Sequence, residues 1–445
     1  MVSRKKATSP SERFMPSCLP TATSSEGVGS LTVAMGTSLA GCGADSAGIL
    51  EALYGYASYH RCPEACRAGS RPSRYTRHAM RVAAITPILV EVPLRSAVQG
   101  VHGTTAVQRS VLVRVTTDEG GEGWGNVDPT PGYSLVSASD IHDAVARLAP
   151  ALIRADPFNL HRALALMDRE TAEGFEAKAA IEMALLDVKG RALGLPVHSL
   201  LGGALTPEVT LNAWIGTVAP EQAAREATGW LRRGFATAKI KISGAGPEGI
   251  ARVAAVRAAV GDRMALRVDF NESLALAESV AFIRQLDPYA LTLVEQPIVR
   301  TDLAGLAEIR RAIHIPLMAD ESVTGPASLI EIIRREAADI VKVKVMKQGG
   351  LLRTRQMIEC AAAAGLRVVV GHGFGLTLST LAEAAVAATC DAVMPGCEAV
   401  GPLKMAGDVV RDPINLEGGV IRLTEAPGLG ATIDPDALKR YRVER

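Results

Sequence analysis

The chain has 445 residues, 48% of them hydrophobic, which is enough for two packed domains or for one barrel with an attached cap. A formal net charge of +1 provides no basic face for nucleic acid and no acidic field for cationic partners, so no nucleic-acid partner is expected. No apolar run approaches the roughly 18 residues of a membrane span, so we expect a soluble protein without a membrane partner. The cysteine usage described below adds that the protein is expected to be cytoplasmic.

Residues 1–79 differ in composition from the rest of the chain. They are rich in Ser, Thr, Gly, Cys and Arg, and no hydrophobic period persists in them. We expect a disordered extension, or upstream sequence that is absent from the native protein if Met80 is the true start. Leu39-Ala40-Gly41-Cys42 looks like a lipoprotein cleavage box, but the preceding segment carries acids and lacks a good apolar region. The seven cysteines form neither a disulfide framework nor a metal knuckle, which favours a reducing compartment.

Residues 80–206 are predicted to form an α+β capping domain of ordinary size. Three segments have the composition of strands in an antiparallel meander: 85–94, 109–117 and 121–127. Amphipathic helices are predicted after them at 141–154, 159–170 and 176–192. The segment 99–106 is predicted as a loop that contains His102 and two glycines, which suits a mobile lid with a residue that contacts a ligand; most such loops are only connections.

Residues 207–413 alternate β-rich runs with helical stretches. Eight runs are predicted as strands: 209–215, 237–243, 265–270, 291–296, 316–321, 340–345, 367–371 and 392–395. Polar residues recur near the strand ends every 24 to 28 residues, the length that one strand-loop-helix unit needs: Lys241, Asp269, Glu295, Asp320, Lys344 and His372. This regularity predicts a parallel (β/α)₈ TIM barrel with its site at the C-terminal ends of the strands. Residues 414–445 are predicted to return to the capping domain, where residues 420–423 would add a strand.

Three of these strand ends are acidic. Asp269, Glu295 and Asp320 fall on consecutive strands and would converge at one mouth of the barrel. Converging carboxylates repel each other unless a hard cation lies between them, and Mg²⁺ or Mn²⁺ prefers such oxygen ligands. A single acid of this kind is usually a salt bridge or a helix cap, but three in register predict a Mg²⁺ site.

Lysines complete the predicted site. On an extended strand Lys239 and Lys241 share one face, and two ammonium groups held that close favour loss of a proton, which makes a lysine a usable base. Lys344 ends the sixth strand, which faces the second across the mouth. A small carboxylate substrate would then have a lysine on each face. The arrangement suits removal of a proton from the carbon next to the carboxylate, giving an enediolate that the metal stabilises.

These residues resemble the enolase superfamily, and within it the muconate-lactonizing-enzyme subgroup of the mandelate racemase/muconate lactonizing enzyme family. The matching motifs are Lys239-x-Lys241, Asp269-x-Asn271, Glu295-Gln296-Pro297, Ala319-Asp320-Glu321-Ser322 and Asp339-Ile-Val-Lys-Val-Lys344 followed by Gly349-Gly350. Ala180-Ile181-Glu182 and Leu200-Leu201-Gly202-Gly203, outside the site, also resemble sequence motifs of the family. The match runs from about residue 81 to the C-terminus.

The resemblance implies a role for each matching position. Lys241 would be the base on one face, Lys239 would tune its pKa and touch the substrate carboxylate, and Lys344 would be the acid or base on the other face. Asp269, Glu295 and Asp320 would hold Mg²⁺, with Asn271 supporting the metal and Glu321 orienting Lys344. A homo-oligomer is also implied by the resemblance.

Two departures bear on the substrate. Dipeptide epimerases of this subgroup carry Asp-x-Asp after the eighth strand, where this chain has Cys397-Glu398-Ala399, a context closer to a cycloisomerase. His372 ends the seventh strand at a position with no fixed residue in the subgroup. His372 and Glu398 are therefore candidate substrate contacts, although His372 could equally be hydrogen-bonded to backbone.

Several functions remain open on the sequence alone. The leading hypothesis is an Mg²⁺-dependent isomerase, either a muconate-type cycloisomerase or a racemase or epimerase of an amino-acid derivative. A dehydratase of a hydroxy acid would use the same parts, and a non-catalytic binding barrel is the alternative of another class.

Overall fold

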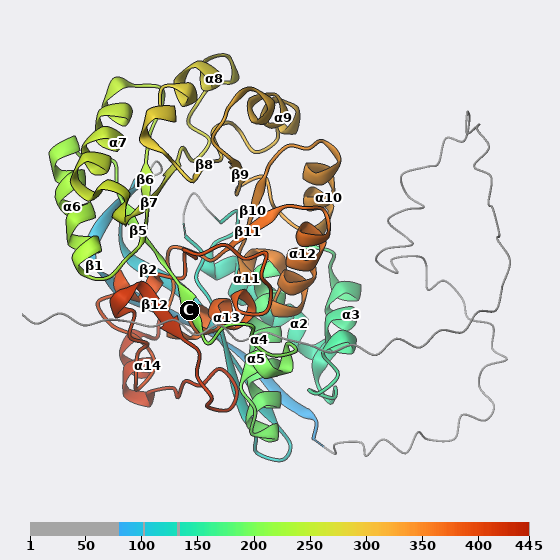
Figure 1. Cartoon of the computed structure of the whole chain (residues 1–445). Coiled ribbons are helices and arrows are strands. Elements are labelled where there is room, and N and C mark those ends of the chain that lie inside the picture. The colour runs from blue at the N-terminus through green and yellow to red at the C-terminus, as the bar shows by residue number, and fades with distance from the viewer. Residues whose placement is uncertain (1–79, 101–102, 131–133, 445) are drawn as a thin grey trace, which may run out of the picture. The chain divides into compact units, whose positions relative to one another are not determined.

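The computed structural model describes residues 80–444 except 101–102 and 131–133 (Figure 1). The predicted extension over 1–79 and His102 of the predicted lid lie outside the described residues. None of the helices in the described part of the chain is long and apolar enough to cross a membrane.

The described chain opens with an antiparallel sheet in the order β1-β2-β3, as predicted: β1 (Val82–Gly100), β2 (Gly103–Thr117) and β3 (Glu122–Val127). The first two strands are longer than predicted, because backbone pairing continues to Val98↔Thr105 and Gly100↔Gly103. The prediction of a loop over 99–106 was therefore wrong for most of that segment. A long hairpin takes its place, since the polar and glycine residues there do not prevent the two backbones from pairing.

The three predicted helices of the capping domain follow this sheet as α2 (Ala138–Leu152), α3 (Leu160–Glu170) and α4 (Phe175–Leu193). The short α5 (Val197–Leu200), which was not predicted, comes after them. A capping box between Ser137 and Asp140 begins α2. Helix α4 is buried along most of its length and packs on β3. Gly123 and Gly125 permit this approach, because a Cβ atom at either position would collide with the backbone of α4.

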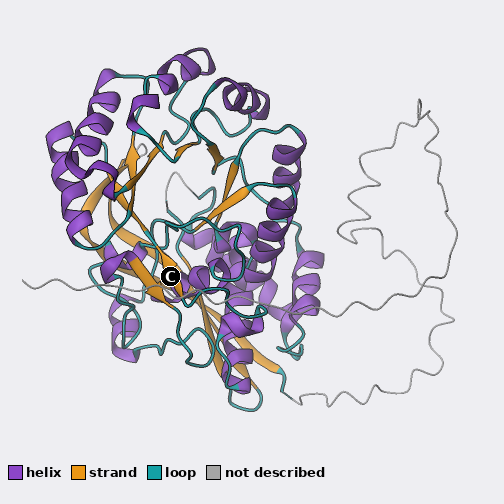
Figure 2. Cartoon of the chain, viewed as in Figure 1, coloured by secondary structure: helices purple, strands orange, loops and turns teal. Residues whose placement is uncertain are grey.

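Seven parallel strands then form the barrel wall, in chain order from β5 to β11 (Figures 1 and 2). They are β5 (Asn212–Ile215), β6 (Thr237–Lys241), β7 (Ala265–Asp269), β8 (Leu293–Glu295), β9 (Leu317–Ala319), β10 (Ile340–Val343) and β11 (Arg367–Val370). The eighth predicted strand, 392–395, contributes only isolated bridges in the structure. Val393 pairs with Val368 of β11, and Cys397, two residues beyond the predicted strand, pairs with Leu211 just before β5, so the segment 393–397 closes the ring.

Helices surround these strands, as Figure 2 shows in purple outside orange. They are α6 (Pro220–Arg232), α7 (Pro247–Val260), α8 (Leu276–Arg284), α9 (Leu303–Ala312), α10 (Pro326–Arg334), the short α11 (Val345–Gln348), α12 (Leu351–Ala363) and α13 (Thr377–Ala387). Single 3₁₀ turns lie at η2 (Gly261–Arg263), η3 (Asp287–Tyr289), η4 (Gly401–Leu403) and η5 (Glu417–Gly419). The alternation of strand and helix is that of a (β/α)₈ barrel with a capping domain.

The tail returns to the capping domain through its last helix, but its predicted strand pairs elsewhere. Residues 420–423 were predicted to add a strand to the capping domain, but β12 (Val420–Arg422) pairs with β4 (Glu208–Thr210) instead. The predicted first barrel strand, 209–215, is accordingly divided into β4 and β5, because its first residues pair antiparallel with the tail. The last helix, α14 (Pro435–Tyr441), packs on β1, and Arg442 bridges to Val90.

A buried carboxylate joins the capping domain to the barrel. Glu182 on α4 accepts hydrogen bonds from the backbone amides of Leu351 and Leu352, at the N-terminus of α12. Gly350 precedes them with φ +123°, and a Cβ atom there would collide with the Glu182 carboxylate. The Gly349-Gly350 motif thus gives Glu182 access to the helix end.

Candidate functional site

Charged side chains come together at the C-terminal ends of successive barrel strands. Lys241, Asp269 and Glu295 are the last residues of β6, β7 and β8, and the strand register pairs them in that order. Asp320 directly follows β9, and Lys344 directly follows β10. The strand ends that the sequence predicted as neighbours are therefore neighbours in the barrel.

Lys239 lies one pleat below Lys241 and is surrounded by carboxylates. Its Nζ lies 2.9 Å from Asp269 Oδ2 and 3.2 Å from Glu295 Oε2, and it also contacts Glu398. Burial lowers the pKa of Lys239, but the charges of these three carboxylates outweigh burial and hold its pKa well above the ordinary value. Lys239 therefore remains a cation, as its predicted influence on Lys241 requires.

Lys241 is held by one carboxylate and one amide. Its Nζ lies 2.6 Å from Asp269 Oδ2 and donates to Asn271 Oδ1 at 2.5 Å. Asn271 in turn donates from Nδ2 to Glu321 Oε1 at 2.9 Å, and its backbone amide donates to Asp269 Oδ1. Asn271 has φ 44°, in the left-handed region that asparagine tolerates better than most residues. The side-chain amide of Asn271 thus links Lys241 to Glu321.

Across the mouth from Lys241, Lys344 contacts Asp320, the acid that follows the neighbouring strand β9. Its Nζ lies 2.8 Å from Asp320 Oδ1, and Lys347 donates to the Asp320 carbonyl at 2.8 Å. Burial raises the pKa of Asp320, but the charges of Lys344, Lys342 and Lys347 outweigh burial and hold its pKa well below the ordinary value. Sequence reasoning missed Lys347, which follows Lys344 by three residues on α11; the helical spacing could have indicated it.

Lys342 is a second buried cation that sequence reasoning missed. Its side chain is 1% exposed, and its Nζ lies 3.0 Å from Glu295 Oε1 and contacts Glu398. Glu398 therefore bridges Lys239 on β6 and Lys342 on β10, from opposite walls of the barrel. The spacing Lys342-x-Lys344 repeats that of Lys239-x-Lys241, so the period of two could have revealed an inward-facing side chain.

The three predicted metal ligands have the chemistry that a divalent cation needs. The side chains of Asp269, Glu295 and Asp320 are at most 2% exposed. Burial, and to a smaller extent the charge of Asp269, raise the pKa of Glu295, because a second carboxylate nearby disfavours the ionised form. Lysine ammonium groups balance them here, and within the described residues no three His, Cys, Asp or Glu side chains are grouped to hold an ion. As a donor set, three buried carboxylates fit a hard divalent cation.

His372 is bound to backbone. Its Nε2 lies 2.7 Å from the carbonyl oxygen of Asp128 in the capping domain, and its backbone amide donates to Glu383 Oε2. Burial and the charge of Lys344 lower the pKa of His372 to about 3, so the ring is neutral and donates from Nε2. Of the two alternatives for this residue, the structure shows the backbone hydrogen bond, which fastens the capping domain to the barrel.

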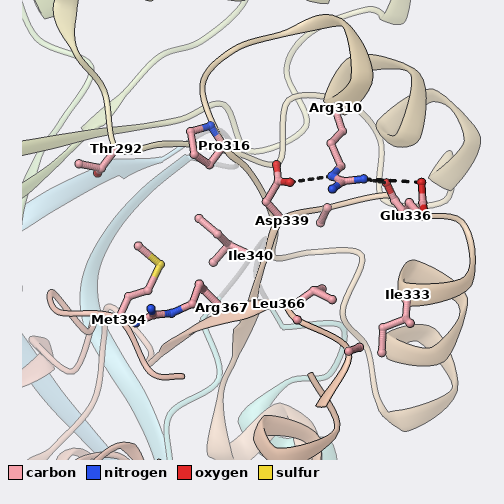
Figure 3. Close-up of a pocket in the computed structure, with 13 residues that line it drawn as sticks. Thr292, Arg310, Pro316, Ile333, Glu336, Asp339, Ile340, Leu366, Arg367 and Met394 are labelled. Carbon is pink, nitrogen blue, oxygen red and sulfur yellow. Dashed lines mark hydrogen bonds and ion pairs between the residues drawn. The ribbon is translucent and has the colours of Figure 1, made fainter. Parts of the chain in front are cut away.

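A pocket at the opposite end of the barrel is separate from these charged residues. It has a volume of about 460 Å³ and is lined by residues at the starts of barrel strands, including Thr292, Asp339 and Ile340 (Figure 3). Arg310 crosses its edge to pair with Asp339 at 2.7 Å. The charged site residues lie at the other ends of the same strands, so this pocket is separate from the candidate site.

Comparisons with known proteins agree with this geometry. The family models described as "Mandelate racemase / muconate lactonizing enzyme, N-terminal domain" and "Enolase C-terminal domain-like" match residues 83–202 and 222–437. An N-succinyl-L-Arg/Lys racemase of Bacillus cereus is 32% identical over 368 residues, which are 82% of this chain and 98% of that protein.

The chain belongs to the enolase superfamily. Within the superfamily it is a member of the mandelate racemase/muconate lactonizing enzyme family. The structure of a muconate lactonizing enzyme from Pseudomonas fluorescens with muconolactone is similar, with a TM-score of 0.79, 30% identity, and coverage of 82% of this chain and 100% of that one.

A third member of the superfamily extends the comparison. The dipeptide epimerase of Enterococcus faecalis, in complex with Mg and L-Leu-L-Tyr, has a TM-score of 0.76 at 28% identity and covers 79% of this chain and 99% of that one. The protein is therefore an enzyme with the isomerase-type chemistry of this superfamily, whose members use a divalent metal.

Proposed function

We propose that this superfamily member is an Mg²⁺-dependent racemase or epimerase of an N-acylated amino acid, with Lys241 and Lys344 as the two catalytic lysines. Lys241 takes the α-proton from one enantiomer and Lys344 takes it from the other. Each lysine returns a proton on its own face after the opposite lysine has removed one. The substrate carbon is therefore inverted without any net change in composition.

The observation that carries this proposal is the placement of the two lysines. Lys241 ends β6, the second barrel strand, and Lys344 follows β10, the sixth, so they come from opposite walls. Each lies against a different carboxylate of the predicted metal set, Lys241 against Asp269 and Lys344 against Asp320. A carboxylate substrate between them would present one face of its α-carbon to each lysine.

Asp269, Glu295 and Asp320 would hold the Mg²⁺, for which Mn²⁺ is the alternative. When bound, the cation would supply positive charge to the substrate carboxylate, on which negative charge develops as the α-proton leaves. Other side chains of the site would bind the substrate carboxylate and position the two catalytic lysines. Lys239 stays a cation beside the substrate carboxylate, and Asn271 holds Lys241 in place through its 2.5 Å hydrogen bond. Glu321 would orient Lys344 by its charge.

A cycloisomerase is the second candidate. It is favoured by Glu398, which stands where dipeptide epimerases of the subgroup would place Asp-x-Asp, and by the likeness to the muconate lactonizing enzyme. Such a reaction, and the dehydration of a hydroxy acid, would need only one of the two lysines as a base. The two lysines therefore distinguish the candidates.

The test is proton NMR in D₂O with the Mg²⁺-loaded full chain. Both enantiomers of N-acyl amino acids are followed for loss of the α-proton signal, beside muconate-type lactones and hydroxy acids. Racemisation predicts exchange with either enantiomer. Lys241→Ala should abolish exchange from one enantiomer and Lys344→Ala from the other, because each variant leaves one face without a base.

Other results would reject the racemase. If both variants lose exchange from the same enantiomer only, or if a lactone or hydroxy acid turns over while N-acyl amino acids do not exchange, the reaction is a cycloisomerisation or a dehydration. A Lys439→Met variant on the exposed face of α14 is the matched control and should behave as the unmodified enzyme.

We also infer a cytoplasmic homo-oligomer. The inference is supported by the family membership and by the cysteine pattern of the sequence. Light scattering of the purified full chain would measure the number of subunits, and a monomeric mass at micromolar concentration would contradict the inference.

A further inference from the structure

The motif Glu295-Gln296-Pro297 contains a polar residue to which the proposed reaction gives no role. Gln296 directly follows β8 and the proposed metal ligand Glu295, and it is fully buried. A buried side-chain amide is tolerated when its polar atoms are hydrogen-bonded, because the interior does not solvate them. The partners of Gln296 therefore show what this residue holds in place.

The side chain of Gln296 is bound to the end of the neighbouring strand, β9. Its Oε1 accepts hydrogen bonds from the backbone amides of Asp320 at 3.0 Å and Ser322 at 3.2 Å. Its Nε2 donates to the Ile298 carbonyl at 2.9 Å and to Ser322 Oγ at 3.0 Å. The amide group thus uses both of its N–H donors and accepts two hydrogen bonds on its oxygen. One of those bonds fixes the backbone of Asp320, another proposed metal ligand.

The backbone of Gln296 is held in a conformation that is costly for this residue type. Its φ is 34°, in the left-handed region that strains a residue with a Cβ atom. Its amide donates to the Met318 carbonyl and its carbonyl accepts from the Glu272 amide, each at 2.9 Å. Asn271 and Glu272, which follow β7, also have positive φ, 44° and 66°. Strained backbone is therefore concentrated where the ligand-bearing strands end, and surrounding hydrogen bonds hold it there.

These contacts make two of the proposed ligands rigid relative to each other. Glu295 is joined to Gln296 by the chain, and Asp320 is joined to Gln296 by the side-chain amide. Mg²⁺ requires near-octahedral ligands at about 2.1 Å, whereas Ca²⁺ accepts about six to eight oxygen ligands at longer and more variable distances. A rigid pair of carboxylates therefore favours the smaller cation, and a loosened pair would lose that advantage.

We propose that Gln296 is a positioning residue, which fixes Asp320 relative to Glu295 and thereby sets the preference of the site for Mg²⁺ over Ca²⁺. The inference rests on the metal ligands of the proposed function, but it does not depend on the substrate or on which lysine is the base. It assigns the effect to the side-chain amide of Gln296 rather than to the volume of the side chain.

Titration calorimetry of the full chain with Mg²⁺ and with Ca²⁺ tests the inference without turnover. Gln296→Met keeps the length of the side chain but removes its four hydrogen bonds. The affinity for Mg²⁺ should fall about 10- to 100-fold, the usual effect of losing a partner of a metal ligand. The affinity for Ca²⁺ should fall less, so the Kd for Ca²⁺ divided by the Kd for Mg²⁺ should fall about 10-fold. Gln296→Glu keeps an oxygen that accepts from Asp320 and Ser322, and it should retain most of the preference.

Matched variants decide whether the effect belongs to positioning. Gln285→Met, at the exposed residue directly after α8, should keep both affinities. Thermal melting without added cation checks that each variant is folded. If Gln296→Met does not fold, Gln296→Asn gives the same test, because asparagine tolerates the left-handed backbone but is too short to keep all four bonds. An equal loss of affinity for both cations, or no loss for either, would overturn the inference.

Asp320→Asn separates this inference from the proposed function. If Asp320→Asn weakens Mg²⁺ binding but Gln296→Met leaves the preference unchanged, the ligand set stands and only the role of Gln296 is wrong. If the unmodified enzyme binds neither cation, or if Asp320→Asn binds Mg²⁺ as the unmodified enzyme does, the ligand set is wrong and the inference about Gln296 fails with it.

Discussion

At the scale of single residues, the site is defined by how lysines and carboxylates alternate inside the barrel. Glu398 lies between Lys239 and Lys342, which come from opposite walls, and Glu295 lies 3.0 Å from Lys342 as well. Buried charges are tolerated only when each has a partner, because the interior solvates them poorly. The ammonium groups are therefore part of what allows the acids of this mouth to be buried: Asp269, Glu295, Asp320, Glu321 and Glu398.

Replacing Lys342 with methionine should destabilise the fold. The substitution keeps the volume but leaves Glu295 and Glu398 with less positive charge, and breaking a buried ion pair in this way costs about 3 kcal/mol. Urea denaturation at neutral pH would measure the free energy of unfolding. Lys439→Met, on an exposed helix face, should change it by less than about 0.5 kcal/mol. Equal stability of the two variants would show that Lys342 does not balance these acids.

Replacing Asp320 with asparagine should weaken metal binding. The variant keeps the shape of a proposed ligand but removes its negative charge, so the affinity for Mg²⁺ should fall at least about 10-fold. Titration calorimetry of the purified enzyme with Mg²⁺ gives the affinity directly. Glu336→Gln, at the other end of the barrel strands, is the matched control and should bind as the unmodified enzyme does. Unchanged affinity in Asp320→Asn would remove Asp320 from the ligand set.

At the scale of elements, the capping domain is joined to the barrel through the N-terminus of α12. Glu182 on α4 is buried and accepts two backbone hydrogen bonds there, and Gly350 gives it room. Burial raises the pKa of Glu182 to about 7 despite those hydrogen bonds. Burial therefore favours the protonated carboxyl group in the folded state, although the two amide hydrogen bonds favour its ionised form.

The pH dependence of stability should reflect this carboxyl group. A folded-state pKa raised from 4.5 to about 7 means that the folded protein holds an extra proton between those values, so its contribution to stability is complete below about pH 4.5 and is lost as the pH rises through about 7. Glu182→Gln cannot titrate. Relative to the unmodified protein, it should gain up to about 3 kcal/mol between about pH 4 and pH 8, measured by urea denaturation at each pH. A constant difference across that range would contradict the assignment.

At the scale of the whole molecule, metal loading and folding should be linked. A ligand that binds only the folded state stabilises it, by about 2.7 kcal/mol when its concentration is 100 times its Kd. The melting temperature of the enzyme should therefore rise with Mg²⁺ concentration and fall after treatment with a chelator. Differential scanning calorimetry would show the shift, and Asp320→Asn should show a smaller one at the same Mg²⁺ concentration. A melting temperature that changes neither with added Mg²⁺ nor with chelator would argue against the proposed metal site.

The sequence by itself determined the alternation of strand and helix and the order of the charged strand ends, because these depend on local periodicity and on a repeat length close to one strand-loop-helix unit. It therefore predicted that Lys241, Asp269, Glu295, Asp320 and Lys344 are neighbours. It could not show the pairing of β4 with β12 or the length of the β1–β2 hairpin, because both depend on which backbones meet.

Only the tertiary structure decided what the remaining polar residues contact. Lys342, Gln296 and His372 are separated in sequence from their partners Glu398, Asp320 and Asp128 by up to 244 residues, as for His372 and Asp128. Burial and these distant partners then determine which lysines remain charged and how the backbone of Asp320 is held. Such properties arise from closing the barrel and placing the capping domain on it, so no local pattern in the chain records them.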